Sequence, residues 1–293
     1  MAYIDIAGVP HYYEWIVEGG ANTPSGNRPV MVFVHGWGSS ARYWRATARA
    51  LSDTYDCLLY DMRGFGRSSA RAQSAPLPYN DPRDDAYALE RYASELLQLL
   101  DTLNVSQVSV QAHSMGSSIA ALLISQAPER IQQAVFACGG VFDYNPLTFG
   151  LFQRIGGIVV QIRPDWITRI PGMDRLTIAR FVHKMPEQPI RQEFLEDYML
   201  ADITAGLGTL YTSVSKHASI AQPEAYSGIR CPTLIVSGEK DIIIPSELGQ
   251  KAAALNDNIH HVEVPGVAHL PMLEASQEYL KLVREFLVPT APH

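Results

Sequence analysis

The residues that decide the fold are 108–117, which read VSVQAHSMGS. Apolar residues occupy alternate positions at the start of this stretch, as they do in a β-strand. From residue 115 onward the chain is rich in small and apolar residues until Pro128, before which a helix is expected to end. The stretch therefore predicts a strand that runs into Ser114 and a helix that begins directly after it.

A serine at such a turn fits the nucleophile elbow, Gly-x-Ser-x-Gly, with Ala112 in the place of the first glycine and Gly116 in the place of the second. Small residues are needed there because the strand and the helix approach each other closely. The first N–H groups of the helix also favour negative charge beside Ser114. The alternative is that Ser114 only caps the helix, since serine is a common N-cap residue.

Further apolar segments predict strands and helices that alternate along most of the chain. The expected strands are residues 3–6, 11–17, 30–34, 57–60, 108–110, 134–138, 233–236 and 261–264. The expected helices are residues 39–51, 84–103, 115–126, 245–255 and 276–287. Such alternation forms βαβ units, so the sequence predicts an α/β fold with a mostly parallel, doubly wound sheet of about eight strands.

The segment 141–222 breaks this alternation, because its strand signals vanish and Gly, Pro and aromatic residues interrupt short helical patterns. A structureless connection of this length inside a compact chain is improbable. We therefore expect a helical cap, inserted after the sixth strand. The core is then divided into residues 1–140 and 223–293, on either side of the cap.

Three further segments place polar or flexible residues directly after predicted strands. Trp37 follows the strand 30–34 in a glycine-flanked turn, so its backbone N–H can point to the same place as that of Met115 and form an oxyanion hole. Asp241 and His269 follow the strands 233–236 and 261–264. The order Ser114, Asp241, His269 at one edge of the sheet predicts a catalytic triad.

Each segment also has a plainer interpretation, as an ordinary turn, a solvated aspartate or a packing histidine. Asp143, just after the strand 134–138, is a rival for the acid of the triad. His113 is expected to be packed away from Ser114, and His183 and His217 lie in the cap with no evident partner.

These segments together resemble the α/β-hydrolase superfamily, in its serine-nucleophile, cap-bearing, esterase- or lipase-like form. Residues 60–68, YDMRGFGRS, are similar to the Asp-x-Arg-Gly-x-Gly-x-Ser turn of cap-bearing members, where the turn is structural. Asp61 and Arg63 are accordingly expected to brace a tight loop and not to act in catalysis.

The resemblance implies a hydrolase that forms an acyl-enzyme on Ser114 and needs no cofactor or metal. We expect a carboxylic ester as substrate, small to medium in size and lipophilic. Lactone, thioester and carbon–carbon cleavage stay open as alternatives, as do a cofactor-free perhydrolase or haloperoxidase and a receptor of the same fold without turnover. Dehalogenases and epoxide hydrolases of this fold are disfavoured, because they carry aspartate at the elbow.

Composition excludes other classes of function. The chain has 293 residues, a net charge of −7 and 47% hydrophobic residues, which disfavours disorder and nucleic-acid binding. Three widely spaced cysteines, Cys57, Cys138 and Cys231, predict neither a disulfide framework nor a zinc site. A reducing cytoplasm fits best, because no secretory signal and no transmembrane segment is evident. Oligomeric state is left open.

The early cap is unusually apolar between residues 147 and 162. Three interpretations are open for its side chains: they line a lipophilic pocket, they pack the cap on the core, or they touch a membrane surface, although no basic cluster accompanies them. The residues concerned are Phe149, Leu151, Phe152, Ile155, Ile158, Val159, Val160 and Ile162.

Overall fold

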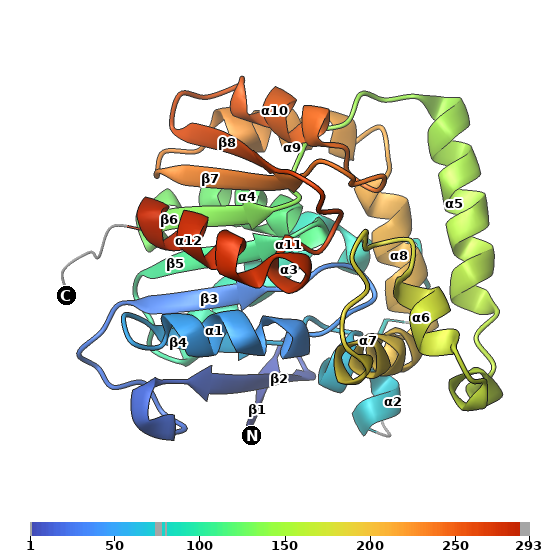
Figure 1. The fold of residues 1–293 in the computed structure, drawn as a ribbon, viewed down its shortest axis with the longest axis horizontal. Coiled ribbons are helices and arrows are strands. Elements are labelled where there is room, and N and C mark those ends of the chain that lie inside the picture. The colour runs from blue at the N-terminus through green and yellow to red at the C-terminus, as the bar shows by residue number, and fades with distance from the viewer. Residues whose placement is uncertain (1, 74–77, 80, 288–293) are drawn as a thin grey trace.

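The computed structural model describes residues 2–73, 78–79 and 81–287, and an eight-stranded sheet forms its centre (Figure 1). The strands are β1 Ala2–Ile6, β2 Val9–Ile16, β3 Val30–Val34, β4 Asp56–Tyr60, β5 Val108–His113, β6 Ile131–Ala137, β7 Thr233–Gly238 and β8 Ile259–Val264. Their order in the sheet is β1-β2-β4-β3-β5-β6-β7-β8. Only the pairings of β2 with β1 and with β4 are antiparallel. The predicted α/β fold with a mostly parallel sheet is confirmed.

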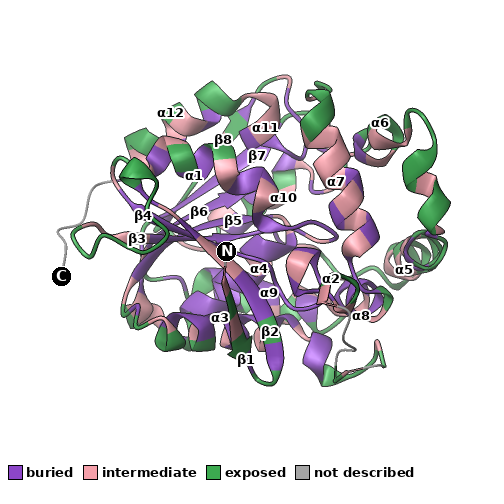
Figure 2. Cartoon of the chain, turned by 90° about the horizontal axis from the view of Figure 1, so that it is seen from below, coloured by how far each residue is buried: buried purple, intermediate pink, exposed green. Residues whose placement is uncertain are grey.

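Helices cover both faces of the sheet, because the central strands are apolar on both sides. In β3, Val32 and Val34 pack toward α3, α4 and α9, whereas Met31 and Phe33 pack toward α1 and α12. The central strands β3 to β7 are accordingly buried between two helical layers, as Figure 2 shows, whereas the edge strands β1 and β8 are only partly buried. The helices are α1 Arg45–Leu51, α2 Ala70–Gln73, α3 Leu89–Thr102, α4 Met115–Gln126, α5 Pro146–Gln161, α6 Met173–Ile178, α7 Gln188–Leu200, α8 Ile203–Ser213, α9 Ala218–Ser227, α10 Ser246–Ala253, α11 Pro271–Glu274 and α12 Ser276–Phe286.

Two predicted helices begin later than expected, because a short 3₁₀ turn precedes each of them. Ala41–Trp44 forms such a turn before α1, and the Ser40 hydroxyl caps it by accepting from the N–H of Arg42. Asp84 caps a second turn before α3, and extended backbone at Ala88 separates that turn from the helix.

The loop after β4 is structural, as its sequence predicts. The buried Asp61 carboxylate accepts hydrogen bonds from the N–H of Ala41 at 2.8 Å and from Arg67 Nε at 2.6 Å. Arg63 is fully buried, and its Nε lies 2.9 Å from Oε1 of Glu95 on α3. The loop thereby joins the end of β4 to elements on both faces of the sheet.

Helices α5 to α8 lie between β6 and α9 along the chain, and Figure 1 shows them beyond the carboxyl ends of the parallel strands. A buried contact fastens them to the core: the Asp197 carboxylate of α7 accepts from Ser40 Oγ at 2.5 Å and from Arg42 Nε at 2.8 Å. The predicted division after residue 222 falls within α9, which packs on α4. None of the helices in the described part of the chain is long and apolar enough to cross a membrane.

The apolar residues of the early cap do not pack on the core as a group. Val160 is buried and Phe149 is half-buried, but the other six side chains that the sequence singles out are exposed. Of the three interpretations left open by the sequence, packing on the core does not hold for most of them. The reason is that α5 turns small residues, not large ones, toward the rest of the protein.

Candidate active site

Ser114 lies in a sharp turn between β5 and α4. Its backbone has φ 54° and ψ −122°, a strained conformation for a residue with a side chain. Gly116 explains why a small residue is needed two positions later, since a Cβ there would lie 2.6 Å from the carbonyl oxygen of His35. The turn leaves Ser114 partly exposed, although its neighbours His113 and Met115 are buried.

A chain of hydrogen bonds joins Ser114 to two residues distant in sequence. His269 Nε2 lies 2.9 Å from Ser114 Oγ, and His269 Nδ1 lies 2.7 Å from Asp241 Oδ2. Since a carboxylate can only accept, His269 donates from Nδ1 and accepts the Ser114 hydroxyl at Nε2. The structure thus brings together the three side chains that the sequence predicts to meet.

Close contact between two loops places Asp241 beside His269. At the end of β7, a Cβ on Gly238 would lie 2.1 Å from the carbonyl oxygen of Ala268, so only glycine lets the loop after β8 approach. The N–H of Lys240 donates to the carbonyl of Val267 at 2.8 Å and fixes the two loops together.

Asp241 is held in its ionised form. Burial by itself raises the pKa of this carboxyl group, but the hydrogen bond and charge of His269 and the N–H groups of Ile243 and Ile244 outweigh burial. The pKa of Asp241 is consequently lower than usual. A buried carboxylate next to Nδ1 fixes the orientation and the tautomer of the imidazole.

The loop after β3 runs beside Ser114 at the same edge of the sheet. A Cβ on Gly36 would lie 3.4 Å from Cβ of Ser114, which shows how near the two turns are. Trp37 follows directly, and its indole Nε1 donates to the carbonyl of Gly206 in α8 at 3.0 Å. The backbone N–H groups of Trp37 and Met115 have no acceptor among the residues that the structure describes.

His113 is a buried residue that connects the loop after β3 to His269 by hydrogen bonds. The N–H of Gly36 donates to the Tyr43 hydroxyl at 2.7 Å, and that hydroxyl lies 2.9 Å from His113 Nδ1. His113 Nε2 lies 2.7 Å from the carbonyl oxygen of His269. Burial, with the charge of His269, lowers the pKa of His113 to about 3, so the ring is neutral at ordinary pH. It therefore donates from Nε2 and accepts the Tyr43 proton at Nδ1.

The segment between α6 and α7 also reaches the site. The carbonyl of Phe181, between α6 and α7, accepts the N–H of His269 at 2.9 Å, and the two rings lie 6.0 Å apart. No sequence signal points to Phe181 or Tyr43, since neither follows a predicted strand and both contacts join distant segments.

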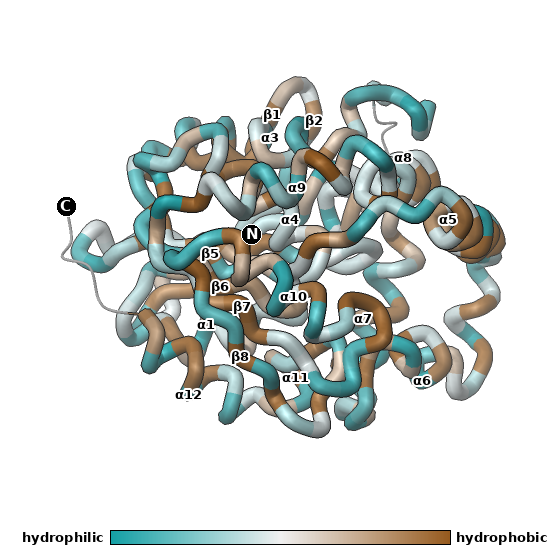
Figure 3. The backbone as a smooth tube through the Cα atoms, turned by 90° about the horizontal axis from the view of Figure 1, so that it is seen from above, coloured by the Kyte–Doolittle hydropathy of each residue, from teal (hydrophilic) through white to brown (hydrophobic). Residues whose placement is uncertain are grey.

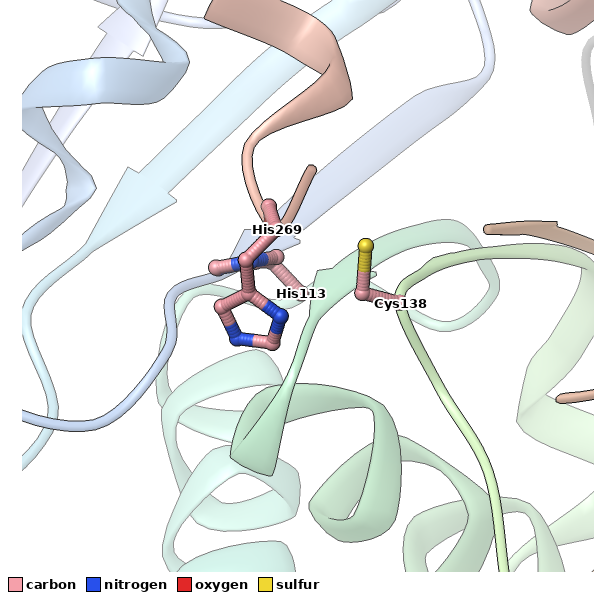
Figure 4. Close-up of side chains that lie close together, drawn as sticks. All are labelled: His113, Cys138 and His269. Carbon is pink, nitrogen blue, oxygen red and sulfur yellow. The ribbon is translucent and has the colours of Figure 1, made fainter. Parts of the chain in front are cut away.

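Figure 4 shows His113 and His269 together with Cys138. Each of the three offers one atom that could bind a metal ion, and these atoms lie within 4.8 Å of one another. The set does not suit a metal ion, because all four ring nitrogens already form hydrogen bonds. Burial also raises the pKa of the Cys138 thiol well above its usual value, which disfavours the thiolate that a metal requires.

Other candidate residues lie elsewhere. Asp143 is exposed and pairs with Lys251, so the structure does not bring it to His269. His217, expected to have no partner, lies 2.7 Å from Glu90 of α3, a contact between segments too far apart for the sequence to reveal. The His183 side chain is exposed. A shallow depression on α12, lined by Gln277, Leu280, Lys281, Arg284 and Glu285, shares no residue with the hydrogen-bonded chain.

A sequence model of the family described as "alpha/beta hydrolase fold" matches residues 29–276. The uncharacterized hydrolase YugF of Bacillus subtilis is 25% identical over 253 residues, which cover 85% of this chain and 84% of YugF.

Two solved structures are similar over nearly their whole length. An esterase from Thermogutta terrifontis has a TM-score of 0.75 at 19% identity, with 97% of each chain covered. An enol-lactonase from Burkholderia xenovorans LB400 has a TM-score of 0.71 at 19% identity, with 97% of this chain and 99% of that one covered. At these identities the two structures indicate a shared fold alone.

Proposed function

Since the chain belongs to the alpha/beta hydrolase fold family, we propose that it is a serine hydrolase that cleaves carboxylic esters of lipophilic compounds. The observation that carries this proposal is the chain of hydrogen bonds from Ser114 Oγ through His269 to Asp241, with donor–acceptor distances of 2.9 and 2.7 Å. A serine linked to a base, which is itself oriented by an acid, is the arrangement that activates a hydroxyl for acyl transfer.

In the first step, Ser114 Oγ attacks the carbonyl carbon of the ester while His269 Nε2 takes the hydroxyl proton. The C–O bond to the alcohol then breaks, and His269 returns the proton to the departing oxygen. In the second step, a water molecule gives a proton to His269 and attacks the acyl carbon. The bond from that carbon to Ser114 Oγ then breaks, which releases the acid, and His269 returns the proton to Ser114 Oγ. Asp241 stays ionised throughout and stabilises the imidazolium.

The backbone N–H groups of Trp37 and Met115 form the proposed oxyanion hole. Gly36 brings the first of them close to Ser114, and α4 presents the second at its N-terminus. Each such donor is worth roughly 3–4 kcal/mol of transition-state stabilisation.

Aromatic side chains at the edge of the site support a lipophilic substrate. Phe181 packs near His269, and the half-buried indole of Trp37, the residue after Gly36, donates to the carbonyl of Gly206 in α8. These side chains offer apolar surface to an acyl or alcohol group next to Ser114.

A panel of chromogenic esters of increasing acyl length tests the function. We expect hydrolysis of several members of the panel. Their kcat/KM should rise by up to about fourfold per added CH₂, the equivalent of ~0.8 kcal/mol, up to the longest acyl group that the site accepts. Matched thioesters, lactones and a peroxide-dependent assay run in parallel. Inactivity toward every ester, together with turnover of one of the other classes, would contradict the ester assignment.

Replacement of Tyr43 by phenylalanine is expected to lower kcat about tenfold with little change in KM, because each missing or misplaced hydrogen bond costs roughly 1–3 kcal/mol. The substitution removes the hydroxyl that joins Gly36 to His113, and so loosens both the oxyanion loop and the backbone of His269. Steady-state kinetics on the best ester measure the effect.

Tyr279→Phe is the matched control, since the Tyr279 hydroxyl is also buried but donates to Gln111 at 2.7 Å and not to His113. It should lose similar stability in a thermal melt and keep its kcat. Equal loss of kcat in both variants would mean that Tyr43 acts only through general stability.

A further inference from the structure

Helix α5 carries its large apolar side chains on the side that faces solvent. Leu147 is 83% exposed, Leu151 59%, Ile155 53%, Ile158 58% and Ile162 67%, although residues of this kind are ordinarily buried. Their spacing of three or four residues places them in one stripe along the helix. Figure 3 shows α5 as a hydrophobic segment at the outer edge of the molecule.

The inner side of α5 explains why the stripe cannot simply turn inward. A Cβ on Gly156 would lie 2.8 Å from Leu210 of α8, and Gly157 and Val160 are buried nearby. A side chain at position 156 would require Leu210 to move, so the close approach of α5 to α8 favours small residues on this side of the helix. The helix is therefore held against α8 by its small residues, with the apolar stripe directed away.

Exposed apolar residues continue beyond α5, through the 3₁₀ turn Asp165–Arg169 and into α6. Trp166 is 58% exposed, Ile170 40% and Leu176 67%. We call all of these residues together the cap face: Leu147, Leu151, Phe152, Ile155, Ile158, Val159, Ile162, Trp166, Ile170 and Leu176.

The charge of this segment is opposite to that of the whole chain. Residues 144–185 contain six Lys and Arg against two Asp, whereas the chain has a net charge of −7. Both of those acids are paired, Asp165 with Arg71 and Asp174 with Arg191. Five basic side chains of the segment are exposed and form no ion pair with any described residue: Arg154, Arg169, Arg175, Arg180 and Lys184. The sequence hides this basic character, because only Arg154 falls within the apolar stretch itself.

We propose that the cap face binds the surface of an anionic lipid bilayer, with its apolar side chains at the boundary of headgroups and acyl chains and the five free cations of the same segment on the lipid phosphates. Apolar residues combined with unpaired Lys and Arg are what such an interface recognises. A symmetric contact with a second copy fits less well, since it would set the same five cations against one another.

Binding to vesicles tests the proposal, with the Ser114→Ala protein used so that no lipid is hydrolysed. Large vesicles of phosphatidylcholine alone are compared with vesicles that also contain phosphatidylglycerol, by sedimentation. Trp166 serves as an internal probe, because Trp15 and Trp44 are buried and Trp37 is half-buried. We expect binding to the anionic vesicles only, weaker at high salt, with a blue shift of tryptophan emission that is lost in Trp166→Phe.

Two pairs of substitutions show whether vesicle binding depends on the cap face or on any exposed apolar side chain. Leu151→Gln with Ile158→Gln should weaken binding about tenfold or more, because two apolar side chains no longer leave water. Ile220→Gln with Ile242→Gln is the matched control, 52% and 66% exposed but outside the cap face, and should bind like the parent.

Arg169→Gln with Arg175→Gln should weaken binding to anionic vesicles by about fivefold per residue. Thermal melts check that each variant is folded. Absence of binding, equal binding to neutral vesicles, or equal effects of the two apolar pairs would overturn the proposal. A concentration-dependent dimer abolished by the cap-face pair, without vesicle binding, would overturn it in favour of self-association.

Discussion

Replacement of Ser114 by alanine is expected to lower kcat by about 10⁴-fold or more, while the melting temperature stays almost unchanged. The alanine keeps the packing of the elbow and removes only the oxygen that lies 2.9 Å from His269 Nε2. What activity is left comes from binding and from the N–H groups of the oxyanion hole. Steady-state kinetics on the best ester of the panel, with a thermal melt, measure both effects.

His269→Ala and the double variant complete this experiment. Residues that act as one unit lose their effect together, so either single variant and the double variant should have nearly the same kcat. If the losses of kcat in the two single variants add up in the double variant, Ser114 and His269 do not act in one step. If Ser114→Ala keeps its activity, Ser114 is not the nucleophile.

Ser114→Gly distinguishes a functional serine from a structural one. Glycine adopts the φ of 54° at no cost, whereas alanine is strained there, so the glycine variant should be about 1 kcal/mol more stable than the alanine variant. If the Ser114→Gly variant is inactive and yet more stable than the Ser114→Ala variant, the serine is present for its chemistry and not for its contribution to folding. A glycine variant no more stable than the alanine variant would contradict this view of the turn.

Local sequence signals predicted the core of the fold well, because each depends on neighbouring residues. Helix α4 has the bounds expected from the small residues after Ser114 and the proline at 128. The convergence of Ser114, Asp241 and His269 was predicted from their place after parallel strands, whose carboxyl ends meet at one edge of a sheet. Their hydrogen bonds agree with that prediction, and their catalytic roles stay a prediction until they are tested.

Contacts between distant segments had no such signal. Nothing near Tyr43 indicates that its hydroxyl lies between Gly36 and His113, and nothing near Arg63 indicates that Glu95 is its partner. The direction in which α5 turns its apolar residues had no local signal either. An apolar helix is expected to turn its large residues inward, but on α5 the glycines at 156 and 157 occupy that side.

Replacement of Asp241 by asparagine is expected to lower kcat by about 10⁴-fold, because an amide stabilises the wrong tautomer of the imidazole. The carboxylate that receives Nδ1–H at 2.7 Å also stabilises the imidazolium formed during the attack, and the neutral amide does not. Asp143→Asn is the matched control, since that side chain is exposed and pairs with Lys251. A loss of kcat in Asp143→Asn, with Asp241→Asn still active, would reverse the assignment of the acid.

The wild type and Asp241→Asn should also differ in how their stability depends on pH. Because the pKa of Asp241 is lower in the folded protein than its usual value of 3.8, its ionised form stabilises the fold at neutral pH. That contribution is fully present above the unfolded pKa and is lost as the pH falls through the lower, folded pKa. The wild type should therefore be more stable than Asp241→Asn by roughly 1–3 kcal/mol at pH 7, and the difference should shrink below about pH 4. Urea melts across this pH range measure it. A difference that is constant with pH would mean that the asparagine acts through packing and not through charge.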